Sequence, residues 1–481
     1  MDFLNKLSEK RQNMPSGKFF AIRLLVIGFL MIIFLFPVHL VQGLIVDRNQ
    51  RQDSAVKEVS SKWGDPQAVV GPILVVPYYL YGAIPKVGAY IDVAKMRLAY
   101  FVPETLKING DIKSQIRTRG IYQVPLYEAD LKVTGKFGVL DLAAAGLSSQ
   151  QMFWDKAYVA VGGLDLSGLK SQLSINWNGR ENKFTAGSKS KLFSSEIVAS
   201  VALAAGAEVG SHTFSLTIPM RGSQNLFFIP VGKSTEAKLA SDWPSPSFDG
   251  AFLPTNHEIS SNGFTASWQV FELNRNLPNS WTEASQVGFS QAISNVASNQ
   301  AGSYDAADSQ YKNYSEAYNL GEFGVRFFRP VDVYHKSTRA AKYAMAVIGL
   351  VFMIYFLVEA AARRRVNPLQ YILVGLALCI FYTLLLSLSE YIAFGLAYLI
   401  ASAAVVGMIG LFTKSILQSW RLGIVTALVL VFLYGFIFIL LQSKDYTLLI
   451  GSIGLFIILG VIMYFSRYIN WYGEEKENMV E

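Results

Sequence analysis

Apolar stretches long enough to cross a bilayer as a helix, which takes about 20 residues, occur six times in this chain. The first covers residues 24–46. The other five follow one another near the C-terminus, at 343–362, 369–389, 391–412, 422–441 and 446–465. Between the first and the second lies a polar stretch, 47–342, which is far too long for a loop without a fold of its own. The pattern therefore predicts a multi-pass α-helical membrane protein with one large inserted domain.

The inserted domain alternates between apolar and polar positions with the period of two that half-buried strands show. The apolar members of four such segments are Met96, Leu98, Tyr100 and Val102; Leu131, Val133, Gly135 and Phe137; Phe214, Leu216 and Ile218; and Phe264, Ala266, Trp268 and Val270. Asn109-Gly110 predicts a hairpin turn, because both residues tolerate the positive φ of a type I′ turn. Residues 51–63 are the main helical candidate, a stalk that continues the first span, and the Ser/Asn-rich stretch 290–321 is typical of a long loop. We expect a mainly antiparallel β domain, built like a sandwich.

Basic residues in the short segments indicate the orientation of the spans, since Lys and Arg accumulate on the cytoplasmic side. If residues 1–23 are inside, the segments on that side contain twelve Lys and Arg, whereas the short turns on the other side have only Lys444. The first span is longer than the roughly 7–15 apolar residues of a cleaved signal, so we interpret it as a retained anchor. Both termini, 1–23 and 466–481, are then cytoplasmic, and the large domain lies across the membrane.

Composition narrows the function classes further. Apolar residues make up 52% of the chain and charged residues 16%, against roughly 25% charged in soluble domains. The net charge of +7 does not indicate a nucleic-acid partner, because the basic residues do not cluster on a soluble module. The four histidines have no paired spacing and the single Cys379 lies in a predicted span, so no metal site is expected. Nucleotide-binding loops and nucleophile elbows are missing, and no cofactor is expected.

Two carboxylates at the ends of predicted spans are candidate functional residues, because ionisable groups inside a membrane are costly to bury. Glu359 lies near the inner end of the second span, and Glu390 lies in the turn between the third and fourth. We favour a structural role for both. Glu359 has Arg363 four residues later as a partner, and Glu390 is placed to cap the next helix at its N-terminal dipole end.

Aspartates of the inserted domain raise the alternative of paired catalytic carboxylates, as in glycan hydrolases. The four candidates are Asp92, Asp111, Asp130 and Asp141. We favour the structural interpretation, because turns and strand ends are where Asp usually occurs.

Aromatic residues are dense in one part of the inserted domain. Five of them lie within about 25 residues, a spacing typical of strands that fill a core: Trp243, Phe248, Phe252, Phe264 and Trp268. The alternative is a binding surface formed by Trp243, Ser247 and Phe248. The two prolines of this WPSPSF stretch favour an edge strand or loop, where a peptide, glycan or lipid can dock.

Several long motifs, in order along nearly the whole chain, resemble the CreD family of bacterial inner-membrane proteins. They are Trp63-Gly64 with Gln67, Gly71-Pro72 and Pro77; RGIYQVPLYEA at 119–129; WPSPSF at 243–248, followed by FLP at 252–254; PVDVYxxxxRAAKYA at 330–344; and NPLQYILVGLALCIFYTLLLSLSE at 367–390. The resemblance implies a Gram-negative inner-membrane protein under two-component control, linked to envelope integrity, colicin tolerance and the response to cell-wall-active antibiotics. It implies no catalytic residues.

The sequence and this resemblance together predict a non-enzymatic protein of envelope stress tolerance. Its β domain is expected in the periplasm, where it binds or senses an envelope component, and its five C-terminal spans form an anchoring bundle in the lipid bilayer. Two alternatives remain open at this point, a transporter or lipid-handling conduit through the bundle and an envelope-modifying enzyme. The sequence does not indicate an oligomeric state.

Overall fold

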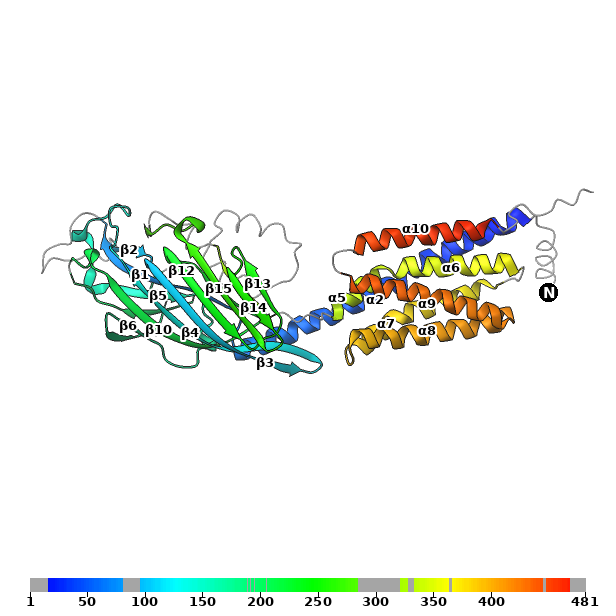
Figure 1. The fold of residues 1–481 in the computed structure, drawn as a ribbon, viewed down its shortest axis with the longest axis horizontal. Coiled ribbons are helices and arrows are strands. Elements are labelled where there is room, and N and C mark those ends of the chain that lie inside the picture. Colours follow the sequence, from blue (N-terminus) through cyan, green and yellow to red (C-terminus); the bar gives the residue numbers. More distant parts are fainter. Residues whose placement is uncertain are drawn as a thin grey trace, which may run out of the picture. The chain divides into compact units, whose positions relative to one another are not determined.

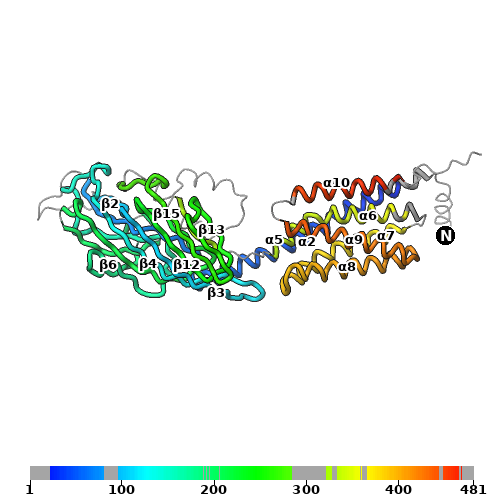
Figure 2. The backbone as a smooth tube through the Cα atoms, viewed as in Figure 1, coloured from blue at the N-terminus to red at the C-terminus, as the bar shows by residue number. Residues whose placement is uncertain are grey.

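The computed structural model describes residues 16–80, 96–283 except 188, 191, 194 and 205, 321–327, 333–362, 366–443 and 447–467. The chain forms two compact units (Figure 1). One, the helical unit, contains Met1–Gln52 and Val331–Glu481. The other, the β unit, contains Asp53–Pro330. The β unit is thus an insertion after the first helix, as the position of the polar stretch predicts, and the chain returns through a strand at 323–327 to the later helices (Figure 2).

In the described residues, the helical unit contains α2 up to Gln52 and six later helices. Their bounds are α2 Ser16–Trp63, α5 Val333–Lys342, α6 Ala344–Ala362, α7 Pro368–Ser389, α8 Phe394–Leu417, α9 Trp420–Gln442 and α10 Thr447–Ser466. As predicted, α2 continues past the first apolar stretch as a stalk. Among the described residues, four helices are long and apolar enough to cross a membrane, or five if α5 and α6, bent by 42°, are one span. The sixth predicted span corresponds to α10, where the apolar helix is shorter, Leu448–Tyr464.

The first helix packs into the bundle along one stripe. Its buried apolar residues recur every three or four positions, as one helix face requires: Ile27, Leu30, Phe34, Val38, Val41 and Ile45. The Phe34 ring lies in a notch left by Gly375 of α7, where an added Cβ would lie 2.4 Å from Phe34 Cζ. The first span is therefore part of the bundle and not a separate tether.

The β unit has two sheets. Sheet A has nine strands, with β2 and β16 placed beside the path β13-β17-β11-β1-β5-β9-β8. Its strands are β1 Gln67–Tyr79, β2 Met96–Phe101, β5 Tyr158–Gly162, β8 Thr185–Ala186, β9 Glu196–Ser200, β11 Asn225–Ile229, β13 Pro246–Gly250, β16 Ser280–Thr282 and β17 Phe323–Phe327. Sheet B has eight strands in the order β14-β15-β12-β3-β4-β10-β6-β7. Its strands are β3 Thr105–Arg119, β4 Tyr122–Phe137, β6 Ser174–Trp177, β7 Arg180–Lys183, β10 His212–Ser223, β12 Ser234–Ser241, β14 Asn256–Ser260 and β15 Gly263–Phe271.

One apolar core joins the two sheets. It contains Tyr100 and Phe323 from sheet A and Tyr127, Phe137 and Trp268 from sheet B, all essentially buried. The four segments with period-two alternation lie in β2, β4, β10 and β15, which confirms those strands. Each sheet also contains a parallel pair, β1 with β11 and β12 with β3, so the sheets are mixed. The predicted loop 290–321 lies outside the described residues except for its last residue.

The hairpin predicted at Asn109-Gly110 is wrong, because both residues lie inside β3. The turn between β3 and β4 is ten residues later, at Gly120, which has a φ of +60°. Gly110 faces the core, where an added Cβ would lie 2.7 Å from Leu239 and 2.8 Å from Leu131 side-chain atoms. This glycine gives room to the ends of two leucine side chains within the sheet and does not form a turn.

Candidate functional site

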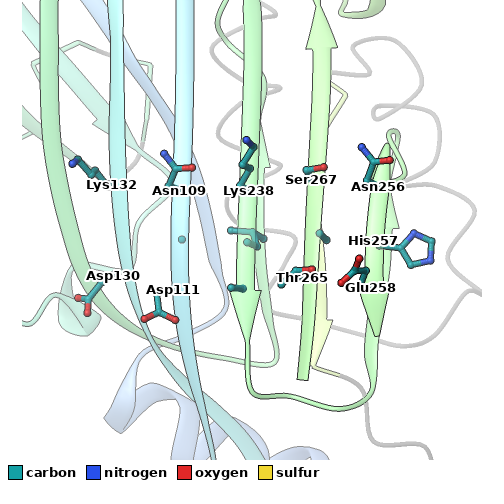
Figure 3. Close-up of a pocket in the computed structure, with 14 residues that line it drawn as sticks. Asn109, Asp111, Asp130, Lys132, Lys238, Asn256, His257, Glu258, Thr265 and Ser267 are labelled. Carbon is teal, nitrogen blue, oxygen red and sulfur yellow. The ribbon is translucent and has the colours of Figure 1, made fainter. Parts of the chain in front are cut away.

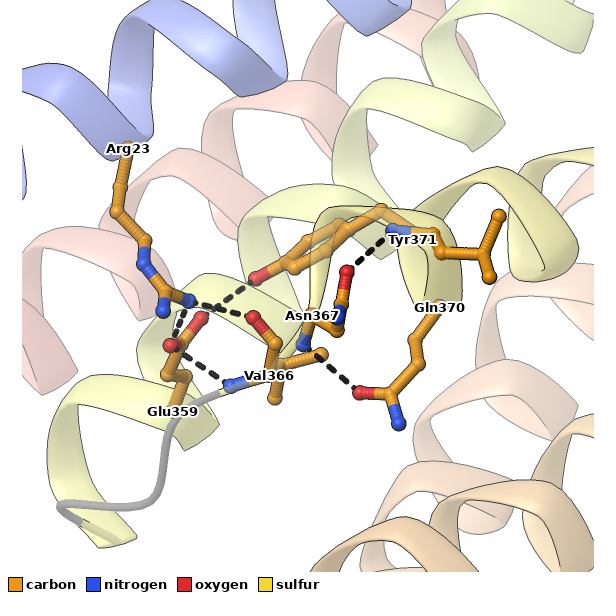
Figure 4. A network of polar contacts seen from close by, with 7 residues as sticks. Arg23, Glu359, Val366, Asn367, Gln370 and Tyr371 are labelled. Carbon is orange, nitrogen blue, oxygen red and sulfur yellow. Dashed lines mark hydrogen bonds and ion pairs between the residues drawn. The ribbon is translucent and has the colours of Figure 1, made fainter. Parts of the chain in front are cut away.

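Glu359 of α6 is buried in a network of polar contacts (Figure 4). Arg23 of α2 forms an ion pair with its Oε1, which also accepts from the Val366 N–H at 3.0 Å. The Tyr371 hydroxyl donates to Oε2 at 3.1 Å. Both carboxylate oxygens are thus bonded, as a buried charge requires. The structure gives Glu359 a partner 336 residues distant, Arg23. The expected partner Arg363 lies outside the described residues.

The start of α7 holds this network in place. Asn367 is the N-cap: its side-chain oxygen accepts from the Leu369 N–H at 3.1 Å, and its own N–H donates to Gln370 Oε1 at 2.9 Å. Pro368 occupies the first helical turn, where its missing N–H costs nothing. This capping box orients Val366 so that its N–H faces Glu359.

Glu390 also has a different role from the one predicted. It is the C-cap of α7 in a helical conformation, whereas the N-cap of α8 is Ala393, so Glu390 does not cap α8. The capping prediction fails because the turn is short and α7 extends through Ser389. Instead, the Tyr334 hydroxyl of α5 donates to Glu390 Oε1 at 3.0 Å, and Arg48 Nε lies 3.8 Å from the same oxygen.

Both glutamates thus pair with arginines of the same helix, α2. Arg23 and Arg48 are 25 residues apart on α2, about 37 Å along a helix, and each pairs with a glutamate of a later helix. That length lies between the hydrocarbon thickness of a bilayer, about 30 Å, and its thickness with headgroups, about 40–45 Å. We interpret both glutamates as residues that fix the first span in the bundle at its two ends.

The WPSPSF stretch lies at an edge, as its prolines predict, because β13 is the terminal strand of sheet A. Its aromatic residues nevertheless face inward. Trp243 is 6% exposed, and the Phe248 ring lies 5.6 Å from Phe264 and 5.7 Å from Trp268. Ser247 is half-buried and paired with β17. The structure thus uses these aromatic residues for packing.

A groove that sequence reasoning missed lies on the outer face of sheet B (Figure 3). Two adjoining hollows of about 820 and 660 Å³ share Asp111, Ala240, Glu258 and Thr265, and together they form what we call the groove. The strands that cross it are β14, β15, β12, β3 and β4. Sequence reasoning named two of its residues, Asp111 and Asp130, but not the groove, because the groove depends on the parallel pairing of β12 with β3, whose residues are more than 120 positions apart.

Side chains in the groove form two rows across the strands, because residues i and i+2 of a strand share a face. The register places Asn256, Ser267, Lys238, Asn109 and Lys132 in the first row. The second row contains Glu258, Thr265, Ala240, Asp111 and Asp130. Figure 3 shows the first row with its ammonium and amide groups and the second with its carboxylates. The small Ala240 leaves the middle of the second row open.

Two like charges face each other in the groove, an arrangement that lowers the stability of the sheet. Asp111 lies directly opposite Asp130, and like charges in such a pair destabilise a sheet. In the described part of the chain, no side-chain ion pair involves either aspartate or Lys132. By contrast, Glu236, just outside the groove, lies 3.2 Å from both Lys107 and Lys238. Hydrogen bonds from these two lysines hold the pKa of the Glu236 carboxyl below its usual value.

Metal ligation finds no support among the described residues, where no group of three or more His, Cys, Asp or Glu side chains could hold an ion. His212 stacks on Trp177 and its Nδ1 contacts the Asn178 amide at 3.0 Å. His257 packs against Phe248 with ring centroids 5.5 Å apart. Of the four aspartates considered from the sequence, Asp111 and Asp130 meet. Asp141 accepts from the Ala144 N–H in a turn, and Asp92 lies outside the described residues.

Two comparisons with known proteins give the same family. The model of the CreD family, described as inner membrane protein CreD, matches residues 19–472. The inner membrane protein CreD of Escherichia coli K12 is 27% identical over 457 residues, which cover 92% of this chain and 91% of that protein. Crystal structures of an M1 zinc metallopeptidase from Deinococcus radiodurans share 10% and 9% identity, with TM-scores of 0.21 and 0.20. These alignments cover 37% of this chain and 40% and 39% of the enzyme, and a likeness this low carries no functional argument. The chain belongs to the CreD family of inner membrane proteins.

Proposed function

We propose that this chain is a non-enzymatic protein of envelope integrity, in which the helical unit anchors a periplasmic β unit that binds an envelope component. The observation that carries the proposal is the groove on sheet B. It presents Lys132, Asp111 and Asp130 without ion pairs to other described residues. It also places Asp111 directly opposite Asp130, and a like-charge pair that opposes local stability is typical of a functional site.

The orientation rests on the twelve basic residues on one side of the predicted spans and the single Lys444 on the other. Cysteine labelling in a Cys379→Ser background tests it. A cysteine at Ser171 of the β unit should react with a membrane-impermeant reagent in intact spheroplasts, whereas one at Gln370 should not. Reversed labelling at the two positions would contradict a periplasmic β unit.

Binding is favoured over hydrolysis by the surroundings of the two aspartates. A glycosidase needs a carboxylic acid that burial keeps protonated near neutral pH, beside a second, ionised carboxylate. Asp111 and Asp130 are both exposed on an open sheet face, with Lys132 next to Asp130 on β4. Neither aspartate therefore has the buried setting that the acid of a glycosidase requires.

Filling the groove tests the proposal in cells. In a strain that lacks the chain, Ala240→Trp places an indole in the middle of the groove. Ser215→Trp, on β10 of the same sheet face but outside the groove, is the matched control. We expect the control to restore tolerance of a cell-wall-active antibiotic and Ala240→Trp to fail at equal membrane abundance. Full tolerance with Ala240→Trp would remove the groove from the function.

A further inference from the structure

The charge pattern of the groove identifies a class of ligand, an inference that rests on the proposed function because it concerns the same site. We infer that the groove binds a short, extended, zwitterionic peptide, with its carboxylates over the lysine row and an ammonium group over the aspartate pair. The two rows are two residues apart along each strand, about 6.8 Å. A ligand that satisfies both must therefore carry opposite charges at about that separation.

The spacing along each row favours a peptide. Lys238 and Lys132 lie on β12 and β4, with β3 between them, so their backbones are about 9.6 Å apart. A ligand that reaches both lysines must carry two anionic groups at a similar separation. Three residues of an extended peptide, at about 3.4 Å each, cover that distance. Asp111 and Asp130 are on adjacent strands, about 4.8 Å apart, and suit a single ammonium group between the two anions.

The neutral side chains of the groove agree with a peptide backbone. Asn109 lies between the two lysines in the first row, and Asn256 and Ser267 continue that row toward the edge strand β14. Amide and hydroxyl side chains both donate and accept, as peptide groups require. The residues that line the larger hollow include no Phe, Tyr or Trp, the side chains on which sugar rings usually stack, and the His257 ring packs against Phe248.

The ion pair between Lys238 and Glu236 does not prevent Lys238 from binding a ligand carboxylate. Lys238 lies 3.2 Å from Glu236, and both side chains are substantially exposed. Exposed pairs of this kind contribute little to stability, and Glu236 also has Lys107 as a partner. A ligand carboxylate can therefore take the place of Glu236 beside Lys238 at small cost.

Binding of synthetic peptides to the purified full chain in lipid nanodiscs tests the inference. The probe is N-acetylated Ala-Glu-Lys-Ala with a free C-terminus, which has one ammonium between two carboxylates. One comparison peptide has Gln in place of Lys, and the other has Gln in place of Glu and an amidated C-terminus. We expect the zwitterionic peptide to bind at least tenfold more tightly than either at low salt. Equal binding of all three would overturn the inference.

Variants of the chain assign each charge to its row. Asp111→Asn with Asp130→Asn should remove the preference for Lys over Gln in the peptide and retain the preference for carboxylates. Lys132→Gln with Lys238→Gln should remove the preference for carboxylates and retain the preference for Lys over Gln. Matched controls on the surface of the β unit, Asp155→Asn and Lys183→Gln, should change neither preference.

Two further results separate the possible explanations. The aspartate double variant should melt at a slightly higher temperature than the native chain, because it relieves the like-charge pair, so weaker binding by it cannot result from unfolding. Glycerophosphoethanolamine is the competing zwitterion, and its binding in place of the peptides would assign the groove to a lipid headgroup and overturn the inference. If no peptide binds but Ala240→Trp abolishes tolerance, the proposed function stands and the inference falls.

Discussion

The two units of this chain distribute apolar and charged side chains in opposite ways. In the β unit the largest aromatic residues, such as Trp268 and Phe137, are buried, and the charged residues of sheet B face outward. In the helical unit Phe432 and Phe456 are 67% and 78% exposed, while Glu359 and Glu390 lie inside. Each unit therefore matches a different solvent, water for the β unit and hydrocarbon for the helical unit.

The comparison also explains where function is expected. Inside the helical unit a charge must be neutralised, and both glutamates have an arginine of α2. On the outer face of sheet B a charge can remain unpaired at little cost, because water solvates it. Unpaired charges of the groove are thus available to a ligand, whereas paired charges of the bundle are committed to structure.

Replacing one large aromatic residue in each unit should show the contrast most strongly. Trp268→Ala removes a buried ring and its hydrogen bond to the Phe252 carbonyl, and we expect a loss of about 3–5 kcal/mol from the β unit. Phe432→Ala, on the exposed side of α9, should change stability by about 0.5 kcal/mol or less. Thermal unfolding of the detergent-solubilised chain, followed by near-UV circular dichroism, measures both. Equal losses would contradict the assignment of Phe432 to a lipid-facing surface.

Removing the charge of Glu359 tests the paired carboxylate of the bundle. Glu359→Gln removes the carboxylate that pairs with Arg23, and breaking a buried pair costs about 3–5 kcal/mol. The double variant with Arg23→Gln should recover part of that loss. Asp47→Asn is the control, because its pair with Arg51 is exposed and such pairs contribute about 1 kcal/mol or less. The melting temperature in detergent, read by size-exclusion chromatography, gives the comparison, and additive losses in the double variant would exclude the pair.

Glu196 is the exception in the β unit, a buried carboxylate that has no cationic partner among the described residues. It accepts from the Ser190 N–H at 2.7 Å and from the Ser190 hydroxyl. Burial raises the pKa of Glu196 above its ordinary value of 4.5, although the Ser190 hydrogen bonds oppose the shift. The folded state therefore binds more protons than the unfolded state between those two pKa values. The stability of the β unit should fall as the pH rises through that window.

Glu196→Gln should remove this pH dependence. The amide keeps an acceptor for the Ser190 N–H without a charge, so the variant should melt higher than the native chain at neutral pH. We expect the melting temperature to rise by about 2–4 °C, the shift that about 1 kcal/mol of stability produces in a domain of this size. Melting curves from pH 4 to pH 8 measure the effect, and Glu258→Gln, an exposed residue of β14, is the control. A lower melting temperature for Glu196→Gln at neutral pH would contradict the prediction.

Of the two bundle glutamates, Glu390 should show the smaller effect when it is replaced by Gln. Arg48 is 40% exposed and lies 3.8 Å away, and an amide oxygen still accepts from the Tyr334 hydroxyl. We expect a loss of about 1 kcal/mol or less and unchanged tolerance of antibiotic and detergent at normal abundance. Complete loss of tolerance by a folded, abundant variant would show that the charge itself is used, as in a conduit.

Local patterns predicted the elements that depend on nearby residues. The alternation in β4 and β15 identified those strands, and the stalk at the end of α2 followed from its helical period. Patterns failed where a distant contact decided the outcome. Asn109-Gly110 has the composition of a turn, but pairing with β4 and β12 places both residues inside a strand.

The features of the candidate sites were likewise predictable where they are local and unpredictable where they depend on distant contacts. The sequence by itself determined that two carboxylates lie at the ends of spans and that the inserted segment is rich in strands, because hydropathy and period are local properties. Only the tertiary structure decided that Glu359 pairs with Arg23, that Glu390 pairs with Arg48 and that Asp111 faces Asp130. These pairings join residues from 19 to 342 positions apart. Their geometry follows from helix packing and strand register, which the whole core sets through the combined burial of its side chains.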